Sequence, residues 1–256
     1  MTRRNLFEAF WLKLRFNLKE EASHSYLNYI WWLLEPALLV AVFYLVFEVM
    51  LNRGGEGFLY FLICGKIPFL WFSKSVTNSA GSIMAGRGLI SQMAIPKPFF
   101  PMLVVAQDSV KQIFVMLALA VFIWGSGYAP HLGWLMLPAV MLVQLLLISA
   151  AALFAAAIVP FVPDFRYIIS TGMIMLMFGS GIFYDYRTAL LDMHQRYFLL
   201  NPLARLIEAY RDILIRAAMP DWNGLTIVAI ASIGVIALLG FYYRHRDHVY
   251  ARLVIQ

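Results

Sequence analysis

The stretch GLISQMAIPKPFFPM, residues 88–102, separates two apolar runs that are each long enough to cross a lipid bilayer. It contains Pro96, Pro98 and Pro101, and a helix cannot continue through prolines at this spacing. The half-apolar residues before them predict a short helix that stops at the prolines. A plain connector would be short and polar, so we expect the loop 84–101 to contact another molecule. A rigid loop without a partner is the alternative.

Composition sets the class of protein. Of 256 residues, 62% are hydrophobic and only 13% are charged, whereas soluble domains carry about 25% charged residues. A lone segment in lipid can satisfy its backbone only as a helix. We therefore expect one all-α membrane domain, residues 1–256, with six transmembrane helices. The predicted spans are 29–51, 58–83, 102–124, 134–159, 167–184 and 225–243.

The net charge of +6 follows the distribution expected of a membrane protein and does not indicate nucleic-acid binding. Eleven lysines and arginines lie in the N-terminal segment, the loop 84–101, the turn 160–166 and the C-terminal tail. Cytoplasmic segments carry such an excess. Both termini and the loop 84–101 are therefore expected in the cytoplasm. The segment 185–222, on the opposite side, carries five arginines and is an exception to the rule.

The N-terminal segment, residues 1–27, predicts an amphipathic helix. It lacks the uninterrupted apolar region and the small-residue cleavage site of a signal peptide. Its basic residues flank an apolar set that is typical of a helix lying in the membrane interface. A helix packed on another domain is the alternative. The apolar set is Phe7, Phe10, Trp11, Leu14 and Leu18.

The segment 185–222 is too long and too regular for a plain loop. Asn201 and Pro202 predict a helix start, with asparagine as the cap and proline in the first turn. A second short helix is expected at about 189–199. Two such helices could enter the outer leaflet and return, which requires protein or a wet cavity around them. The apolar residues at helical spacing are Leu203, Leu206, Ile207, Tyr210, Ile213 and Leu214.

Charged residues inside predicted spans are costly and mark candidate functional sites. Asp108 and Lys111 are three residues apart on one helix, so they can pair with each other. Lys66 lies deeper. It either lines a path for an anionic substrate or pairs with Glu35 or Glu48.

Aromatic residues make up 16% of the chain and concentrate in the first two spans. Aromatic faces stack on sugar rings, so an aromatic-lined channel would suit a glycan. An ordinary belt of aromatic side chains at the membrane surface is the alternative. The candidate channel-lining residues are Phe43, Phe47, Trp71, Phe72 and Lys66.

Motifs for catalysis are missing from the sequence. Gly65-Lys66 lacks both the earlier glycine and the following serine or threonine of a phosphate-binding loop. The five histidines and the single Cys64 do not form a metal-ligand set. We therefore predict no enzyme activity, no metal site and no cofactor in this chain.

A secondary transporter would carry ion-coupling carboxylates in broken helices and often an internal repeat, and no repeat is visible. A membrane-bound glycan-processing enzyme would need a catalytic acid–base pair, and none stands out.

Five stretches, in order and covering nearly the whole chain, resemble the polysaccharide-export ABC permeases of the Wzm and KpsM type, the membrane subunits of type-2 ABC exporters. The first, WWLLEPALLVAVFYLVF (31–47), is similar to their first span. GLISQMAIPKPFFPM is similar to their cytoplasmic coupling helix and the start of the third span. FVPDFRYI (161–168) resembles their turn into the fifth span, with Asp164 and Arg166 in matching places. GSGIFYD (179–185) and LLNPLARLIEAYRDIL (199–214) resemble the end of that span and the re-entrant gate helices.

The chain departs from the family pattern at two turns. The family usually has Ser-Pro where this chain has Ser180-Gly181. A glycine that is common after the second gate helix is replaced here by Arg216-Ala217. Both departures concern the local geometry of the turns.

The resemblance implies a homodimer that docks on a separate ATPase subunit, which binds ATP and Mg. It implies export of a lipid-linked polysaccharide across a bacterial inner membrane, with O-antigen favoured over capsular polysaccharide. An ABC exporter of drugs or small lipids is the alternative within this class. The N-terminal helix would be a second contact with the ATPase. The implied coupling residues are Arg87, Leu89, Ile90, Gln92, Met93, Ile95, Pro96 and Lys97, and the implied gate residues are Tyr184, Asn201, Pro202, Arg205 and Arg211. Arg205 and Arg211 could meet the acidic lipid head or pair with Glu208 and Asp212.

Overall fold

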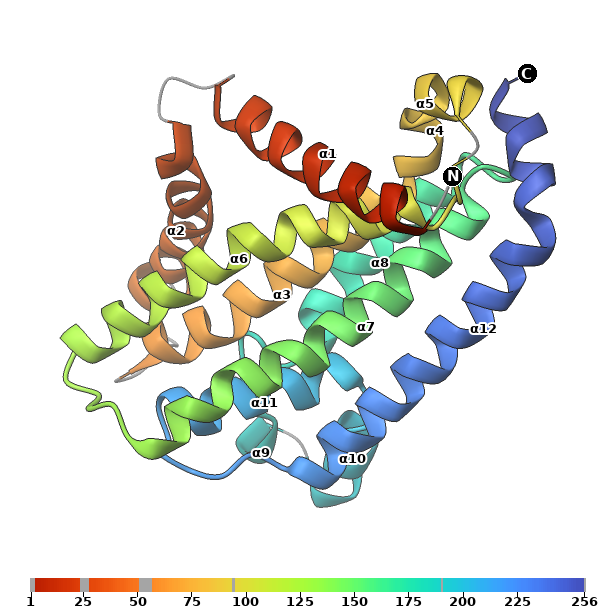
Figure 1. Ribbon diagram of the computed structural model, residues 1–256. Helices are drawn as coiled ribbons and strands as arrows, with labels where there is room; N and C mark the ends of the chain where they lie inside the picture. The colour runs from red at the N-terminus through yellow and green to blue at the C-terminus, as the bar shows by residue number, and fades with distance from the viewer. Residues whose placement is uncertain (1–2, 24–27, 51–56, 94, 190, 256) are drawn as a thin grey trace.

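The computed structural model describes residues 3–23, 28–50, 57–93, 95–189 and 191–255, and these contain helices and no strand. Figure 1 shows long helices packed side by side, with the four shortest α-helices at the two ends of the bundle. The long elements are α1 (Arg3–Ser23), α2 (Trp31–Tyr44, continued by a π-helix at Leu45–Met50), α3 (Phe58–Ala80), α6 (Phe99–Gly125), α7 (Leu137–Ile158, preceded by a 3₁₀ turn at Leu132–Met136) and α12 (Trp222–Ile255). The shorter ones are α4 (Ser82–Ala85), α5 (Arg87–Gln92), α8 (Phe165–Gly179), α9 (Tyr186–Ala189), α10 (Asp192–Phe198) and α11 (Pro202–Leu214).

Five helical segments within the described residues are long and apolar enough to cross a membrane. They match five of the six predicted spans, which confirms an all-α membrane protein. The remaining predicted span, 167–184, holds α8, which ends at Gly179. Its 15 residues correspond to a length of about 22 Å, against roughly 30 Å for the hydrocarbon core. The count of six spans therefore stays a prediction, with α8 as the short candidate.

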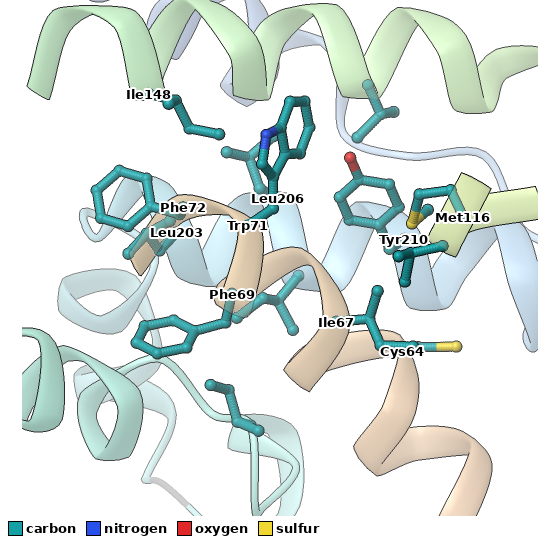
Figure 2. Close-up of a cluster of buried hydrophobic side chains, with 14 of the residues drawn as sticks. Cys64, Ile67, Phe69, Trp71, Phe72, Met116, Ile148, Leu203, Leu206 and Tyr210 are labelled. Atoms are coloured by element: carbon teal, nitrogen blue, oxygen red, sulfur yellow. The ribbon is translucent and has the colours of Figure 1, made fainter. Parts of the chain in front are cut away.

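Helix α3 is the centre of the packing. It lies against α6, α7 and α11. Of the residues in its apolar membrane-spanning stretch, 67% are buried, whereas only 6% are buried in the span that contains α2. Figure 2 shows the core around it, where Phe69, Trp71 and Phe72 of α3 lie near Leu203 and Leu206 of α11. These apolar side chains pack α11 against α3 inside the bundle.

A chain of hydrogen bonds also joins three helices inside the core. The hydroxyl of Tyr210 donates to Oε1 of Gln144 at 2.7 Å. The side-chain nitrogen of Gln144 then donates to the carbonyl of Pro68 at 2.8 Å. Polar groups buried in a membrane bundle are satisfied by such contacts between helices. These two hydrogen bonds connect α11 to α7 and α7 to α3.

The short helices define two ends of the bundle (Figure 1). The α5 end carries α4, α5 and the C-terminal part of α12, and the α10 end carries α9 and α10. Helix α12 has 34 residues and runs between them along α7. The hydroxyl of Tyr243 donates to the carbonyl of Leu153 at 2.9 Å, and that of Tyr250 donates to Ala157 at 2.7 Å. These two bonds hold α12 against α7 over its second half.

Candidate functional site

The loop 84–101 contains the short helix that the prolines predict. Helix α5 spans Arg87–Gln92 and ends before Pro96. It follows Gly86, where an added Cβ would lie 2.3 Å from the ring of Phe100. A side chain at this position would displace that ring, so glycine is required for the close approach of the loop to α6.

The residues of this loop face two ways. Ile90, Ile95 and Lys97 are buried and attach the loop to the bundle. The Lys97 ammonium lies 3.4 Å from Oδ2 of Asp247 on α12 and donates to the carbonyl of Ile95 at 3.2 Å. The loop is therefore joined to the C-terminal part of α12. The exposed members of the predicted coupling set are Arg87, Gln92, Met93 and Pro96, while Leu89 is half-buried.

Helix α1 lies along α6 (Figure 1) and has one face packed against it. Leu14 is 3% exposed, and the rings of Phe10 and Phe99 meet edge to face at 5.5 Å. Phe7 and Trp11 of the predicted apolar set are 65% and 49% exposed. The predicted helix is present. Its exposed aromatic side chains suit a membrane surface, a placement that stays a prediction.

Helix α11 begins where the sequence predicts. Asn201 accepts a hydrogen bond from the backbone N–H of Leu203 at 2.9 Å, and Pro202 is in the first turn. Such a cap satisfies one of the free N–H groups at a helix start. Every residue of α11 except Pro202 and Arg205 is buried. The preceding helix α10 is also present, and re-entry into the membrane stays a prediction.

Arg211 lies at the centre of a buried ionic cluster. Its side chain is fully buried, and its Nη1 lies 2.8 Å from Oε1 of Glu208. The guanidinium lies 3.3 Å from the ring centroid of Phe61, and its Nη2 donates to the carbonyl of Ile182 at 3.1 Å. Burial of a charge is tolerated only with such pairing and hydrogen bonding. Arg211 therefore fastens α11 to α3 and to the segment that follows α8.

The cluster extends from Arg211 to the surface. Arg216 lies 2.6 Å from Glu208, 3.0 Å from Asp212 and 3.1 Å from Asp185. Burial opposes the charge of Arg216, but these carboxylates outweigh it and raise the pKa of Arg216 above its ordinary value. Arg187 lies 3.7 Å from Glu208. The cluster therefore contains three arginines and three carboxylates, and its charges balance; its members are Asp185, Arg187, Glu208, Arg211, Asp212 and Arg216.

Both gate arginines pair with carboxylates of the chain, but only one pairs as predicted. Arg211 pairs with Glu208 as the helical spacing predicts. Arg205 instead pairs with Asp221 at 2.7 Å, beyond the end of α11. Asp221 also accepts a hydrogen bond from the backbone N–H of Gly224 at the start of α12. The contact therefore links α11 to α12.

Two adjoining hollows near the α10 end have aromatic walls. One of about 520 Å³ has Phe61, Tyr128, Asp185 and Arg216 in its lining. The other, of about 390 Å³, has Phe47 and Phe178 in its lining. The residues that both hollows share are Phe58, Phe183 and Tyr184. We call this surface the aromatic groove.

The predicted channel-lining residues divide between this groove and the core. Phe47 stacks on Phe183 at 5.1 Å, and Phe43 contacts the same ring at 4.9 Å. Trp71 and Phe72 are instead 4% and 6% exposed and belong to the core (Figure 2). Periodicity alone did not separate the two groups, because both lie on apolar, aromatic-rich spans.

Lys66 is 3% exposed and has aromatic and sulfur neighbours. Its ammonium lies 4.5 Å from the ring centroid of Phe43 and 2.8 Å from the sulfur of Met177. Glu35, one of its predicted partners, pairs with Lys74 at 2.5 Å. No described carboxylate forms an ion pair with Lys66. The other predicted pair is present, because the Lys111 ammonium lies 2.8 Å from Oδ1 of Asp108.

The turns that depart from the family pattern have unusual backbones. Gly181 has a φ of 69°, and an added Cβ would lie 2.8 Å from the ring of Phe198. Ala217 has a φ of 49°, the left-handed region that favours glycine. At the other predicted turn, Asp164 precedes α8 without a side-chain cap, and Arg166 donates to the hydroxyl of Tyr167 at 3.0 Å.

Sequence reasoning missed Gln144 and the full extent of the ionic cluster. Gln144 is a polar residue in an otherwise apolar run, and this isolation is the signal that could have marked it as a contact between helices. Asp185 and Arg187 meet Arg216 and Glu208 only through the fold, because α10 lies between the two pairs in the sequence. Sequence spacing could indicate the pair of Asp212 and Arg216, which are four residues apart, but it carries no sign of Asp185 or Arg187.

Comparison with known proteins gives one family. The family model described as "ABC-2 type transporter" matches residues 8–215. The chain is 28% identical to the O-antigen export system permease protein RfbA of Myxococcus xanthus, over 86% of this chain and 85% of that protein. It is 24% identical to the protein of the same name from Klebsiella pneumoniae, over 79% and 78%. It is 23% identical to the polysialic acid transport protein KpsM of Escherichia coli, over 86% of each.

Proposed function

The chain belongs to the ABC-2 type transporter family, and from this membership we propose that it is the membrane subunit of an ATP-driven polysaccharide exporter. The substrate is a lipid-linked polysaccharide, with O-antigen favoured over capsular polysaccharide. The observation that carries the proposal is the match, over most of both chains, to permeases named for O-antigen export. The match to a polysialic acid transport protein supports the same class of substrate.

The aromatic groove supports a glycan as the transported group. Phe58, Phe183 and Tyr184 line both of its hollows, and Asp185 and Arg216 add polar groups. Aromatic faces with a few polar groups suit sugar rings, which present apolar C–H faces and hydroxyl edges. In the proposed topology the α10 end faces the periplasm, so the groove lies where the glycan leaves.

The proposed transporter is a homodimer in the bacterial inner membrane, with both termini in the cytoplasm. Each copy docks one separate ATPase subunit through the exposed face of the loop 84–101, and ATP and Mg bind to that subunit. The attachment of the loop to α12 through Lys97 and Asp247 supports a mechanical role, because a push on α5 then reaches a helix that runs to the α10 end. Arg205 and Asp221 join that helix to α11.

A matched pair of substitutions tests the docking surface. Met93→Glu places a charge on the exposed face beside α5, and Met219→Glu places one at the opposite end of the bundle, where Met219 is 71% exposed. Both proteins are to be purified in mild detergent with the ATPase expressed alongside. We expect the ATPase to copurify in equal amount with the unaltered chain and with Met219→Glu, and to be lost with Met93→Glu. Equal retention in both variants would contradict docking at this loop.

A transport experiment tests the substrate. The complex is reconstituted into vesicles that carry lipid-linked O-antigen on the outer leaflet, with the ATPase facing outward. ATP should move the glycan to the inside, where an added glycosidase no longer reaches it. If the glycan stays accessible while a small lipid or drug is moved, the exporter of small molecules is the correct reading.

A further inference from the structure

A small cavity of about 90 Å³ lies between α1, α2, α3 and α6, away from the aromatic groove. The end of α1 and the start of α2, which form one side of it, lie on the same side of the bundle as α5 (Figure 1). The transport cycle proposed above does not use this cavity. Its charged lining residues are Glu21, Glu35, Lys74, Asp108 and Lys111.

Two buried N–H donors belong to residues that line this cavity. The side-chain nitrogens of Gln112 and Trp71 have no hydrogen-bond partner among the described residues. Gln112 is 6% exposed and Trp71 is 4% exposed. A buried donor without an acceptor is unfavourable. Trp71 lies beside Ile148 in the core (Figure 2), so the Gln112 amide is the donor that favours a ligand with an acceptor oxygen in the inner part of the cavity.

The charges of the cavity leave a negative excess. Glu35 pairs with Lys74 at 2.5 Å, and Lys111 lies between Asp108 at 2.8 Å and Glu21 at 2.9 Å. Three carboxylates thus meet two ammonium groups. The side chains of Glu21 and Glu35 are 40% and 41% exposed, so they form the outer part of the lining. A ligand that brings a cation to this outer part would pair with the excess carboxylate.

An apolar groove continues from the polar cavity along the same helices. It has a volume of about 490 Å³ and lies between α2, α3 and α6. Pro36, Ile67 and Val115 line both the cavity and the groove, so the two are contiguous. A polar compartment that opens into a long apolar one matches a lipid, with its head group in the cavity and an acyl chain in the groove.

We infer that this site binds a zwitterionic phospholipid whose head group carries a primary ammonium, the phosphoethanolamine class. A phosphate oxygen accepts a hydrogen bond from the side-chain amide of Gln112, and the ammonium donates to Glu21 or Glu35. A choline head group has no N–H to donate. A purely anionic head group adds negative charge to a site that already has an excess, and this applies to the phosphate of an isoprenyl lipid carrier too.

The bound lipid has a structural consequence for α2. Only 6% of the span that contains α2 is buried within the chain. A lipid seated between α2, α3 and α6 supplies contacts that the protein itself lacks there. The inference does not depend on the transported substrate, because it concerns binding to the chain without ATP or an ATPase.

Binding is measured on the full chain after its native lipids have been exchanged for detergent. Short-chain phosphatidylethanolamine, phosphatidylcholine and phosphatidylglycerol are titrated, together with farnesyl phosphate as a mimic of an isoprenyl carrier, and each Kd is read from native mass spectrometry. We expect phosphatidylethanolamine to bind about tenfold more tightly than the other three, because each of them lacks the charge-assisted hydrogen bond from an ammonium N–H, and phosphatidylglycerol and farnesyl phosphate also lack the cation. Equal binding of the three phospholipids would overturn the inference, since it would reflect the acyl chains alone.

Gln112→Leu tests the role of the inner donor. It should weaken phosphatidylethanolamine about tenfold by removing one donor to the phosphate. Without lipid, its unfolding temperature should equal or exceed that of the unaltered chain, because the variant no longer buries an unpaired amide. Asn223→Leu, at the exposed start of α12, is the control and should leave the affinity unchanged. Undiminished binding to Gln112→Leu, or tighter binding of farnesyl phosphate that Gln112→Leu weakens, would overturn the inference.

Discussion

Helices α8 and α11 are similar in length and opposite in burial. Helix α8 has 15 residues, nearly all uncharged, and none of them is buried within the chain. Helix α11 has 13 residues that include two arginines, a glutamate and an aspartate, and all but two residues are buried. In a water-soluble protein the apolar helix would be inside and the charged one outside.

The difference follows from the solvent. Lipid is as apolar as leucine, so an apolar helix gains little by leaving lipid for the protein interior. A charged side chain in lipid is costly, so it turns inward and finds partners there. Burial in this protein is therefore decided by polar contacts such as those of Arg211 and Tyr210, and α8 is left facing outward.

The largest expected effect comes from Arg211→Met. The substitution removes the buried cation and leaves Glu208 with only its more exposed partners, so we expect a loss of about 3–5 kcal/mol in the free energy of unfolding. Denaturant unfolding in mixed micelles measures it. Glu208→Gln combined with Arg211→Met should recover part of the loss, because it removes the uncompensated carboxylate. Arg205→Met, at a partly exposed pair, is the control and should cost at most about 1 kcal/mol. Equal losses at the two arginines would show that burial of α11 does not depend on the cluster.

Gly65→Ala on α3, at its contact with α11, and Gly172→Ala on α8 compare the surroundings of the two helices by adding one methyl group next to each. At Gly65 the new Cβ would lie 2.8 Å from Nη2 of Arg211 and 3.2 Å from Ile207 on α11. Overpacking of this kind costs about 1–3 kcal/mol. At Gly172 on α8 no atom lies within 4 Å, so alanine should stabilise the helix by up to about 1 kcal/mol. The same unfolding assay measures both, and a loss at Gly172 would indicate a neighbour that packs on α8.

Ala217→Gly should stabilise the protein by about 0.5–1 kcal/mol, because alanine is strained in the left-handed region and glycine is not. The residue follows α11 and has a φ of 49°. The neighbouring Ala218 is exposed, and its φ is not positive. Ala218→Gly is therefore the control and should destabilise by a few tenths of a kcal/mol through the entropy of the unfolded chain. Thermal unfolding of the two variants side by side gives the sign, and destabilisation by both would mean that the turn is unstrained.

Met175→Ala on α8 is expected to have the smallest effect. Met175 is 72% exposed within the chain, so truncation should change the free energy of unfolding by no more than about 0.5 kcal/mol. A loss above about 1 kcal/mol would mean that this face is covered by protein, as a second copy in the proposed homodimer would cover it. Repeating the measurement at several protein concentrations separates the two cases.

Much of the candidate site follows from local sequence. Asn201 and Pro202 mark the start of α11, α5 ends before the prolines, and the pair Asp108–Lys111 follows from its spacing. Each of these depends on residues within one turn of helix or one loop. The surroundings of Lys66 and Trp71 could not be predicted in this way, because periodicity places both residues on an apolar span and does not say which helix lies opposite. The structure puts Trp71 in the core and Lys66 beside Phe43 and Met177.

The sequence by itself determined that this is an all-α membrane protein, where most of its helices begin and end, and which short segments break the pattern of spans. These features depend on apolar run length, proline and capping residues, which act over a few residues. Only the tertiary structure decided that α11 is inside and α8 outside, that Arg205 pairs with Asp221, and that six charges meet around Glu208. Lipid accepts any apolar face, so the choice of neighbours is made by polar contacts between residues far apart in the chain.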